Sequence, residues 1–300
     1  MSDKHFTQLE RIGLQLFSIP ALLDEDFAGT MAMLAMLGYK EIEFFGPYEF
    51  SVQSEREHWA PIGVQLGMRG SGYYGLTAKQ VRDVLDHNGM TSPSMQTDLE
   101  SLRTRMSELA EASHIVGHRY VILPSLRPEH RTSLDAYKRS ADMFNEIGAQ
   151  AVRHGIRFAY HNHGYGFTEI DGQIPIHVLL ERTDPALVDL QMDIYWTTVG
   201  GADPIALLKR YPNRYRLLHI KDMSKPVRFS GDGGDPSQWI EMFPYMADAG
   251  DGIFDLTEIL SQALKSGVQH FLVERDLAPN ASVMLANSFM HLNGLKLDLV

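Results

Sequence analysis

Short apolar runs alternate with longer amphipathic stretches along almost the whole chain. The short runs predict strands, and the stretches between them repeat their apolar residues with the spacing of a helix. Eight strands are predicted at Arg11–Ile19, Glu41–Phe45, Thr91–Thr97, Tyr120–Ser125, Ile156–His163, Val188–Trp196, Tyr215–Met223 and His270–Asp276. Helices are predicted at Phe27–Leu37, Ala78–His87, Leu99–Val116, Ser133–His154, Ile176–Glu181, Pro204–Tyr211, Leu256–Ser266 and Ser282–Leu295. The strand at Thr91–Thr97 is the weakest of the eight, because Pro93 cannot donate to a strand ladder.

This order of elements predicts an α/β fold. Alternating strands and helices form parallel sheets, and eight such units in 300 residues indicate a closed (β/α)8 TIM barrel. The competing fold, a doubly wound open sheet, requires a glycine-rich phosphate turn after an early strand, and the sequence has none. We find no linker or low-complexity segment, so a single domain over residues 1–300 is expected.

Composition and charge narrow the classes of function. The chain has no cysteine, which excludes disulfides, thiolate metal sites and cysteine nucleophiles. Its net charge of −11 opposes nucleic-acid binding, and no local basic patch offsets it. No apolar run is long enough to cross a bilayer, so no membrane partner is expected. The first residues lack the apolar core of a signal peptide, and a cytoplasmic location is expected.

The polar residues at the strand ends indicate where chemistry takes place. Catalytic residues of a barrel lie at the carboxyl ends of its strands, and alternate side chains of a strand share a face. The predicted inward-facing set is His161, His163, Asp193, His219, Lys221 and Glu274. Each of these residues alone can be a strand-end hydrogen-bonding group or a helix cap. Imidazoles and carboxylates that converge from successive strands are instead typical of a site for a divalent cation.

A long segment follows the seventh predicted strand. Residues Ser224–Asp251 exceed the length of an ordinary connection, and long loops in compact domains are usually functional. In a barrel this segment is expected to lie over the active site.

Several motifs, taken in order, resemble one family of barrels. They are AYHNHG (Ala159–Gly164), MDIYW (Met192–Trp196), LLHIKDM (Leu217–Met223), GDGIFD (Gly250–Asp255) and LVERD (Leu272–Asp276). Together they resemble the xylose-isomerase-like TIM barrels. That superfamily contains sugar and sugar-phosphate isomerases and epimerases, inosose dehydratases and AP endonucleases of the endonuclease IV type.

The resemblance implies a set of metal ligands. In the ketose 3-epimerase branch, Glu, Asp, His and Glu hold the metal, and these positions fall on His161, Asp193, His219 and Glu274. The first position departs from that pattern, because histidine replaces glutamate. Some relatives with HNH at this strand carry an acidic residue shortly afterwards, before a phenylalanine, but here Gly166 stands in that place. One divalent ion (Mn, Zn, Co or Fe) is the expected cofactor.

The resemblance also implies a reaction. We expect an isomerase or epimerase that abstracts a proton next to the carbonyl of a sugar or keto-sugar, through a metal-stabilised enediolate. Glu274 or His163 is the expected base, and Lys221 is expected to add electrostatic stabilisation. Loss of a β-hydroxyl on the same site gives the alternative, a lyase that dehydrates an inosose or a 3-keto-glycoside. Two alternatives from other classes are a phosphodiesterase that resembles AP endonucleases and a non-catalytic barrel that binds sugars.

Five further residues are candidates for substrate binding. Phe17, Tyr165 and Trp196 can form an apolar wall against a sugar ring, although each can equally be core packing. Glu43 is a candidate for binding a hydroxyl group or for capping a helix, and Arg275 is a further candidate contact. The expected partner is a small polyhydroxylated substrate. Family members commonly pair, so the resemblance allows a homo-oligomer, while the residues themselves leave the oligomeric state open.

Overall fold

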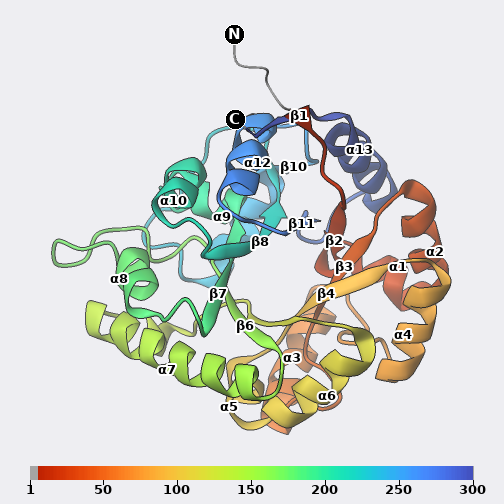
Figure 1. Cartoon of the computed structure of the whole chain (residues 1–300), viewed down its shortest axis with the longest axis horizontal. Helices are drawn as coiled ribbons and strands as arrows, with labels where there is room; N and C mark the ends of the chain where they lie inside the picture. Colours follow the sequence, from red (N-terminus) through yellow and green to blue (C-terminus); the bar gives the residue numbers. More distant parts are fainter. Residues whose placement is uncertain (1–5, 300) are drawn as a thin grey trace.

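Eight parallel strands close into a barrel in the computed structural model, which describes residues 6–299. The strands follow one another around the barrel in the order β11-β2-β3-β4-β5-β6-β7-β8, and this closure confirms the predicted fold. A ring of helices surrounds the strands (Figure 1). The strands are β2 (Gly13–Gln15), β3 (Glu41–Phe45), β4 (Thr91–Gln96), β5 (Tyr120–Leu123), β6 (Arg157–His161), β7 (Val188–Asp193), β8 (Tyr215–Ile220) and β11 (His270–Val273).

The helices follow the strands with local start signals. Ser133 accepts a hydrogen bond from the N–H of Ala136 and so caps α7, and Thr77 and Gln80 form a capping box at α4. The α-helices are α1 (Pro20–Glu25), α2 (Phe27–Leu37), α3 (Gln53–Gln65), α4 (Ala78–His87), α5 (Leu99–Thr104), α6 (Met106–Val116), α7 (Leu134–Arg153), α8 (Pro175–Arg182), α9 (Ile194–Val199), α10 (Pro204–Arg210), α11 (Pro236–Met242), α12 (Leu256–Lys265) and α13 (Ala281–Gly294). Short 3-10 helices lie at Leu16–Ser18, Pro128–His130 and Phe243–Tyr245.

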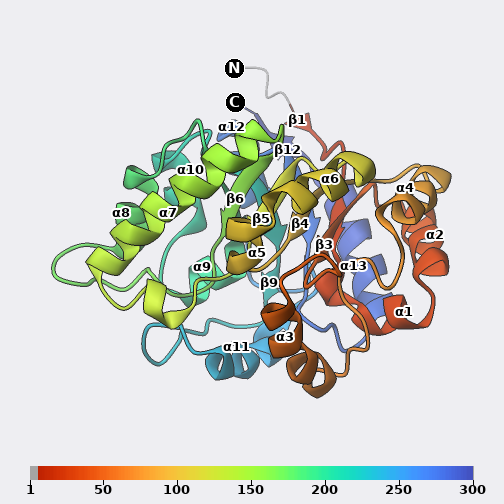
Figure 2. The ribbon, with the colours of Figure 1, turned by 90° about the horizontal axis from the view of Figure 1, so that it is seen from below.

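Two small antiparallel sheets lie outside the barrel. Strand β1 (Phe6–Thr7) pairs with β12 (Leu297–Asp298) and brings the two ends of the described chain together. Strand β9 (Asp222–Met223) pairs with β10 (Met246–Ala247) and closes the base of the long segment after β8. Figure 2 shows β1 and β12 on one side of the molecule, and α3 and α11 on the opposite side.

The strand predicted at Thr91–Thr97 is present despite its proline. Strand β3 pairs Glu41 with Thr91 and Glu43 with Ser94, so β4 contains one more residue than β3 between these two pairs. This irregularity lies at Pro93, whose carbonyl still accepts a hydrogen bond from the N–H of Arg119. A bulge therefore accommodates the proline inside a central strand.

Several boundaries differ from the prediction. The helix predicted at Leu99–Val116 is two helices, α5 and α6, which are separated at Arg105. The apolar pattern continues through Arg105 although its backbone angles are not helical, so the prediction missed this break. Strand β7 ends at Asp193, where the chain turns directly into α9. Helix α3 was not predicted, since Pro61 lies inside it and few of its residues are buried.

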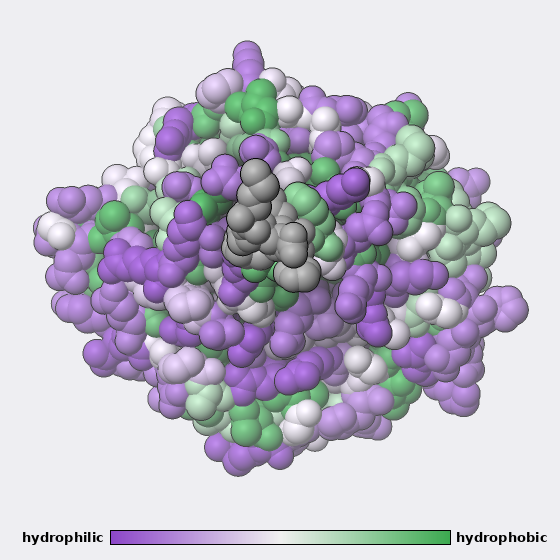
Figure 3. Space-filling view, turned by 45° about the horizontal axis from the view of Figure 1, so that its top comes forward, coloured by the Kyte–Doolittle hydropathy of each residue, from purple (hydrophilic) through white to green (hydrophobic). Residues whose placement is uncertain are grey.

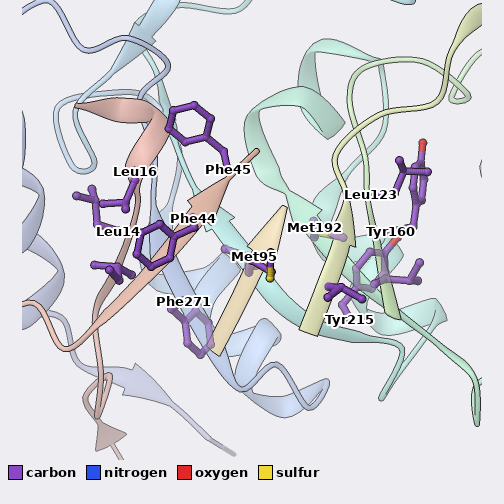
Figure 4. Packing of buried hydrophobic residues seen from close by; sticks show 14 of the residues in the cluster. Leu14, Leu16, Phe44, Phe45, Met95, Leu123, Tyr160, Met192, Tyr215 and Phe271 are labelled. Carbon is purple, nitrogen blue, oxygen red and sulfur yellow. The ribbon is translucent and has the colours of Figure 1, made fainter. Parts of the chain in front are cut away.

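Apolar side chains that point away from the barrel axis form the main core. Leu14, Phe44, Met95 and Phe271 belong to four adjacent strands and pack between the barrel and its helices (Figure 4). Each side chain of this kind that is fully buried contributes about 1.5–3 kcal/mol. Inside the barrel a smaller apolar cluster fills the middle: Tyr120, Ile122, Ala159, Leu217 and Leu272. The barrel interior is therefore packed across its middle, and the polar inward-facing residues lie at its two ends.

The face of the molecule seen in Figure 3 is mostly polar. Figure 3 shows one face on which hydrophilic side chains predominate and hydrophobic ones form small scattered patches. None of the helices within residues 6–299 is long and apolar enough to cross a bilayer.

Candidate active site

The predicted inward-facing residues converge at the carboxyl end of the barrel. Strand β6 ends at His161, β7 ends at Asp193, and β8 carries His219. The register pairs His161 with Gln191 and Asp193 with His219, which places these side chains at neighbouring positions of the interior. Glu274 follows β11 directly and is also buried. The structure thus brings together the four residues that the sequence proposes as metal ligands.

Asp193 lies at the centre of this cluster. Its Oδ1 accepts a hydrogen bond of 2.8 Å from the N–H of Trp196 and caps α9. Its Oδ2 lies 3.9 Å from Nε2 of His161 and 4.0 Å from Nδ1 of His219. This oxygen is buried and has no hydrogen-bond partner among the described residues, although the Lys221 ammonium is 3.1 Å away. The ammonium pairs with this oxygen by charge, and a cation between the oxygen and the two imidazoles would give it a further partner.

One ligand atom from each of His161, Asp193 and His219 can be chosen so that all three lie within 4.8 Å of one another. Glu274 lies next to this group of three, because its Oε2 is 2.7 Å from Nδ1 of His219. Nitrogen and carboxylate oxygen are the ligands that Mn, Zn, Co and Fe accept in proteins. The donor set therefore fits a divalent transition metal.

Lys221 lies among three carboxylates. Its Nζ is 3.1 Å from Asp193, 2.8 Å from Glu274 and 2.7 Å from Asp276. Burial by itself lowers the pKa of Lys221, but these carboxylates raise it well above its usual range, so the side chain is an ammonium. Burial raises the pKa of Asp276, the one residue of this group that the sequence did not single out. The alternation of side chains along the strand places it on the same face as Glu274, and that signal was available in the sequence.

Negative charge is in excess at this end of the barrel. Burial lowers the pKa of His219, but the adjacent carboxylates of Glu274 and Glu43 raise it to about 10. Four buried acidic side chains (Glu43, Asp193, Glu274 and Asp276) therefore face two cations, Lys221 and protonated His219, among the described residues. Burial raises the pKa of both Asp193 and Asp276, so crowding of these acids opposes their full ionisation when no further cation is present. A divalent ion compensates such an excess.

Glu43 lies below the candidate ligands and has no exposed surface. Within residues 6–299 its contacts are with protein groups, so the structure does not present it to a substrate as the sequence suggested. Its carboxylate accepts hydrogen bonds from Gln15, Ser94, Gln96, Gln191 and His219. The strand register explains this arrangement, because Gln15, Glu43 and Ser94 are paired across β2, β3 and β4.

His163 lies just beyond the end of β6 and is partly exposed. Its Nδ1 donates to the carbonyl oxygen of Pro124 at 2.9 Å, which leaves Nε2 as the acceptor of a neutral ring. Burial and the nearby Lys221 lower the pKa of His163 to about 3. The indole of Trp239 stacks on this imidazole with 4.2 Å between the ring centroids. The ring of His163 is thus neutral and held in one orientation.

Trp239 belongs to the long segment after β8, which lies against the site as expected. The anchor of this segment is Phe229, which stacks on Trp196 with 5.8 Å between the ring centroids. A Cβ on Gly164 would lie 2.0 Å from the Phe229 ring, and one on Gly233 would lie 2.4 Å from it. Glycine at both positions therefore allows the phenylalanine to insert between them.

The predicted aromatic wall is only partly accessible. Trp196 is 1% exposed and Tyr165 2% exposed, while Phe17 keeps part of its surface and packs edge-on against Phe45. The Tyr165 hydroxyl accepts from the N–H of Leu126 at 2.6 Å. Of the three aromatic side chains, Phe17 is the one that can still face a ligand in this structure.

Two other residues have partners that the sequence did not indicate. The guanidinium of Arg275 pairs with Asp248, on the other side of the strand from the ligand cluster. Asp222, which follows Lys221 directly, is fully buried. Its carboxylate accepts from the N–H groups of Met223, Gly250, Gly252 and Phe254, so it holds the GDGIFD loop in place.

The fold and this cluster define a class: a parallel (β/α)8 barrel with a candidate metal-binding site at the carboxyl ends of its strands. More particularly, the chain belongs to the xylose isomerase-like TIM barrel family, whose sequence pattern matches residues 31–282. The resemblance seen in the motifs is thereby confirmed.

Several curated proteins are similar to part of the chain. It is 28% identical over 159 residues to inosose dehydratase 2 of Bacillus cereus, a match that covers 52% of this chain and 51% of that protein. The chain thus spans about half the length of the curated relatives it matches.

Solved structures share the fold over nearly the whole chain. A sugar phosphate isomerase/epimerase from Parabacteroides distasonis superposes with a TM-score of 0.69 at 24% identity and covers 97% of this chain and 95% of its own. The IolI protein, solved with a bound zinc atom, superposes with a TM-score of 0.63 at 14% identity, over 93% of this chain and 94% of its own. At these identities the likeness concerns the fold alone.

Proposed function

We propose that the protein is a metal-dependent lyase that removes water from a keto-polyol of the inosose type. The observation that carries the proposal is the Lys221 ammonium, 2.8 Å from Glu274 and 2.7 Å from Asp276. An acid and carboxylates lie side by side next to the candidate metal site, which is what elimination of water requires. The similarity to inosose dehydratases supports the same reaction.

His161, Asp193, His219 and Glu274 would hold the metal ion. When bound, a divalent ion supplies Lewis-acid polarisation of the substrate carbonyl. His219 would bind the ion through Nδ1 after releasing the proton of that atom to solvent, while its Nε2–H donates to Glu43. Glu274 would then lose its hydrogen bond from Nδ1 of His219.

The residues of the chain divide the proton transfers of elimination. A base takes the proton from the carbon next to the carbonyl, a carbon–carbon double bond forms, and the C–O bond at the β-carbon breaks. Lys221 donates the proton with which the departing hydroxyl leaves as water, and Asp276 holds the ammonium in place. Two groups can take the carbon-bound proton, Nε2 of His163 and the carboxylate of Glu274.

Isomerisation or epimerisation remains the second candidate, and the first position of the ligand set bears on it. In the 3-epimerase pattern a second glutamate stands where this chain has His161. His161 is buried, and burial lowers its pKa well below the usual range of histidine, so it is a neutral ligand rather than a second carboxylate base. Elimination needs one base and one acid, and this site offers both. Epimerisation needs a second group that returns a proton to the opposite face of the same carbon.

The test is a product analysis on protein loaded separately with Mn²⁺, Co²⁺ or Zn²⁺. An inosose, a 3-keto-glycoside and an unmodified ketose are incubated in D₂O and followed by NMR and mass spectrometry. Loss of one water with a new unsaturated or diketone product supports the lyase. Deuterium incorporation with no loss of water, or with inversion, supports the isomerase or epimerase instead and contradicts the proposal.

Variants separate the roles of the residues. Lys221→Met is expected to slow elimination by about 10²–10⁴-fold, the usual contribution of a positioned acid. His163→Asn tests one candidate base without changing a proposed metal ligand. Glu274→Gln tests the other, with metal content measured alongside because Glu274 is also a proposed ligand. The base variant stops deuterium exchange at the substrate carbon, while loss of Lys221 still permits exchange without elimination. Elimination that proceeds normally in Lys221→Met would overturn the role of the ammonium.

A further inference from the structure

The buried carboxylate of Glu43 is a hub of hydrogen bonds beneath the candidate metal site. It accepts from side chains on four other strands: Gln15, Ser94 with Gln96, Gln191, and His219. An ionised carboxylate accepts hydrogen bonds and donates none. Every group that contacts Glu43 must therefore turn a hydrogen-bond donor towards it. This requirement fixes which ring nitrogen of His219 carries a proton and which way the amide of Gln191 points.

The first consequence concerns His219. Its Nε2 lies 2.7 Å from Oε1 of Glu43, so Nε2 must carry a proton. The other ring nitrogen, Nδ1, faces Asp193 at 4.0 Å and Glu274 at 2.7 Å. Glu43 thus leaves Nδ1 as the one nitrogen of His219 that can give up its proton and bind a metal.

The second consequence concerns His161 and passes through Gln191. The amide nitrogen of Gln191 donates to Oε2 of Glu43 at 2.7 Å, so the amide oxygen points the other way. Gln96 supports this orientation, because its amide nitrogen lies 3.2 Å from the Gln191 oxygen and 3.1 Å from Glu43. The Gln191 oxygen in turn lies 3.0 Å from Nδ1 of His161, which must then carry the proton. Nε2 of His161 is left unprotonated, 3.9 Å from Oδ2 of Asp193.

We propose that Glu43 is a positioning residue that sets the tautomers of both histidine ligands, directly for His219 and through Gln191 for His161. Partners of this kind fix the orientation and basicity of metal-bound histidines. Glu43 acts on metal affinity without contacting the substrate. The inference rests on the proposed metal site, but it is independent of which reaction that site catalyses.

The same strand provides a matched control. Glu41 precedes Glu43 by two residues, faces the same interior and is 1% exposed. It also binds a histidine, since its Oε2 lies 2.9 Å from Nδ1 of His270, but at the opposite end of the barrel. Glu41→Gln and Glu43→Gln therefore make the same chemical change, to a buried inward-facing carboxylate of one strand with a histidine partner.

The first experiment measures Zn²⁺ affinity by competition with a chromophoric chelator. Glu43→Gln is expected to weaken binding by about 10–100-fold, the usual effect of removing such a partner. Glu41→Gln is expected to bind Zn²⁺ as the unaltered protein does. Unchanged affinity in Glu43→Gln, or an equal loss in both variants, would overturn the proposal, because the second result reflects general damage to the barrel.

The second experiment observes the tautomer itself and keeps the proposal testable if Glu43→Gln does not fold. Gln191→Met leaves Glu43 with its other donors and removes only the link to His161. The ¹⁵N shifts of the imidazoles in metal-free protein should show His161 protonated at Nδ1 in the unaltered chain and no longer held so in Gln191→Met. An unchanged His161 tautomer in that variant would contradict the relay. If the unaltered protein shows the expected tautomer but binds no metal, the positioning role stands and the proposed function fails.

Discussion

The two ends of the barrel interior are both polar and buried, yet they are built differently. At the end that holds the strand starts, Glu41 contacts Arg11 and His270. Asp189 lies 2.8 Å from Arg157 and 3.7 Å from Arg216 at the same end. Each of these carboxylates has a guanidinium partner, and the arginines reach solvent. Here charges are matched, as in ion pairs that serve the structure.

At the carboxyl end the charges do not match. Lys221 faces the carboxyl groups of Asp193, Glu274 and Asp276. Protonated His219 is the second cation beside them, and one oxygen of Asp193 has no hydrogen bond among the described residues. The apolar cluster around Leu217 and Leu272 separates the two ends. The comparison teaches that polarity inside a barrel does not by itself mark function. An uncompensated charge and an unsatisfied buried atom do, because folding alone gains nothing from them.

The largest expected effect comes from breaking the mismatched end. Asp193→Asn removes the central carboxylate, while Asp189→Asn makes the same change four residues earlier on the same strand. We expect Asp193→Asn to lose metal binding and at least about a thousandfold in kcat/KM, equal to about 4 kcal/mol. Asp189→Asn should keep both, as measured by elemental analysis and steady-state kinetics. Equal losses in the two variants would mean that the two ends do not differ in the way described.

At the end that holds the strand starts, where the charges are matched, a substitution should change the free energy of unfolding but not metal binding. Arg157→Met leaves Asp189 with the more distant Arg216, and we expect a loss of about 2–3 kcal/mol in the free energy of unfolding, less than for a fully buried pair because Arg157 is partly exposed. Urea denaturation measures this loss. Arg182→Met, which removes an exposed pair with Asp142, is the control and should cost no more than about 1 kcal/mol. A change in Zn²⁺ affinity in Arg157→Met would contradict the separation of the two ends.

A buried histidine that belongs to neither end makes the folding stability depend on pH. His118 contacts the carbonyl of Ser92 and the hydroxyl of Tyr73, which are neutral partners, and burial lowers its pKa to about 4. The unfolded chain, with a pKa of about 6.5, takes up the proton first as the pH falls. The stability that His118 contributes is thus complete above pH ~6.5 and is lost as the pH falls towards about 4.

When the pH falls from 7 to 5, protonation of this histidine in the unfolded chain should lower the free energy of unfolding by about 2 kcal/mol. Denaturation at the two pH values measures the loss, and His118→Gln should remove that part of the pH dependence. The exposed His87→Gln serves as control and should leave it in place. An identical pH dependence in His118→Gln and the unaltered protein would show that the buried ring is not responsible.

The smallest expected effect concerns the segment that covers the carboxyl end. Trp239→Leu removes the ring stacked on His163, and an aromatic contact of this kind is worth about 0.5–1.5 kcal/mol. We expect KM to rise by roughly 2–10-fold with little change in stability. The neighbouring Ile240 is half exposed, so Ile240→Ala should leave KM unchanged. A fall in kcat with KM constant would instead indicate that Trp239 acts by orienting His163.

Much of the fold follows from local patterns in the sequence. The alternation of apolar runs and amphipathic stretches predicts eight strands and a closed barrel, because the periods of strand and helix are properties of the backbone. The sequence also allowed the prediction of four ligand candidates: His161, Asp193, His219 and Glu274. Parallel strands of a barrel present their carboxyl ends at one face, so strand-end residues converge whatever the exact register.

Other features were decided only by the tertiary structure. Glu43 and His219 are 176 residues apart in sequence, and Glu43 and Gln191 are 148 apart, so their hydrogen bonds depend on strand register and on closure of the barrel. The same holds for Trp239 on His163 and for the N–H groups around Asp222. Sequence periodicity says which way a side chain points, but it does not say which distant side chain it meets. Pairwise contacts of this kind, formed by chain segments far apart in sequence, decide which polar residue holds a ligand in place and which one is exposed to react.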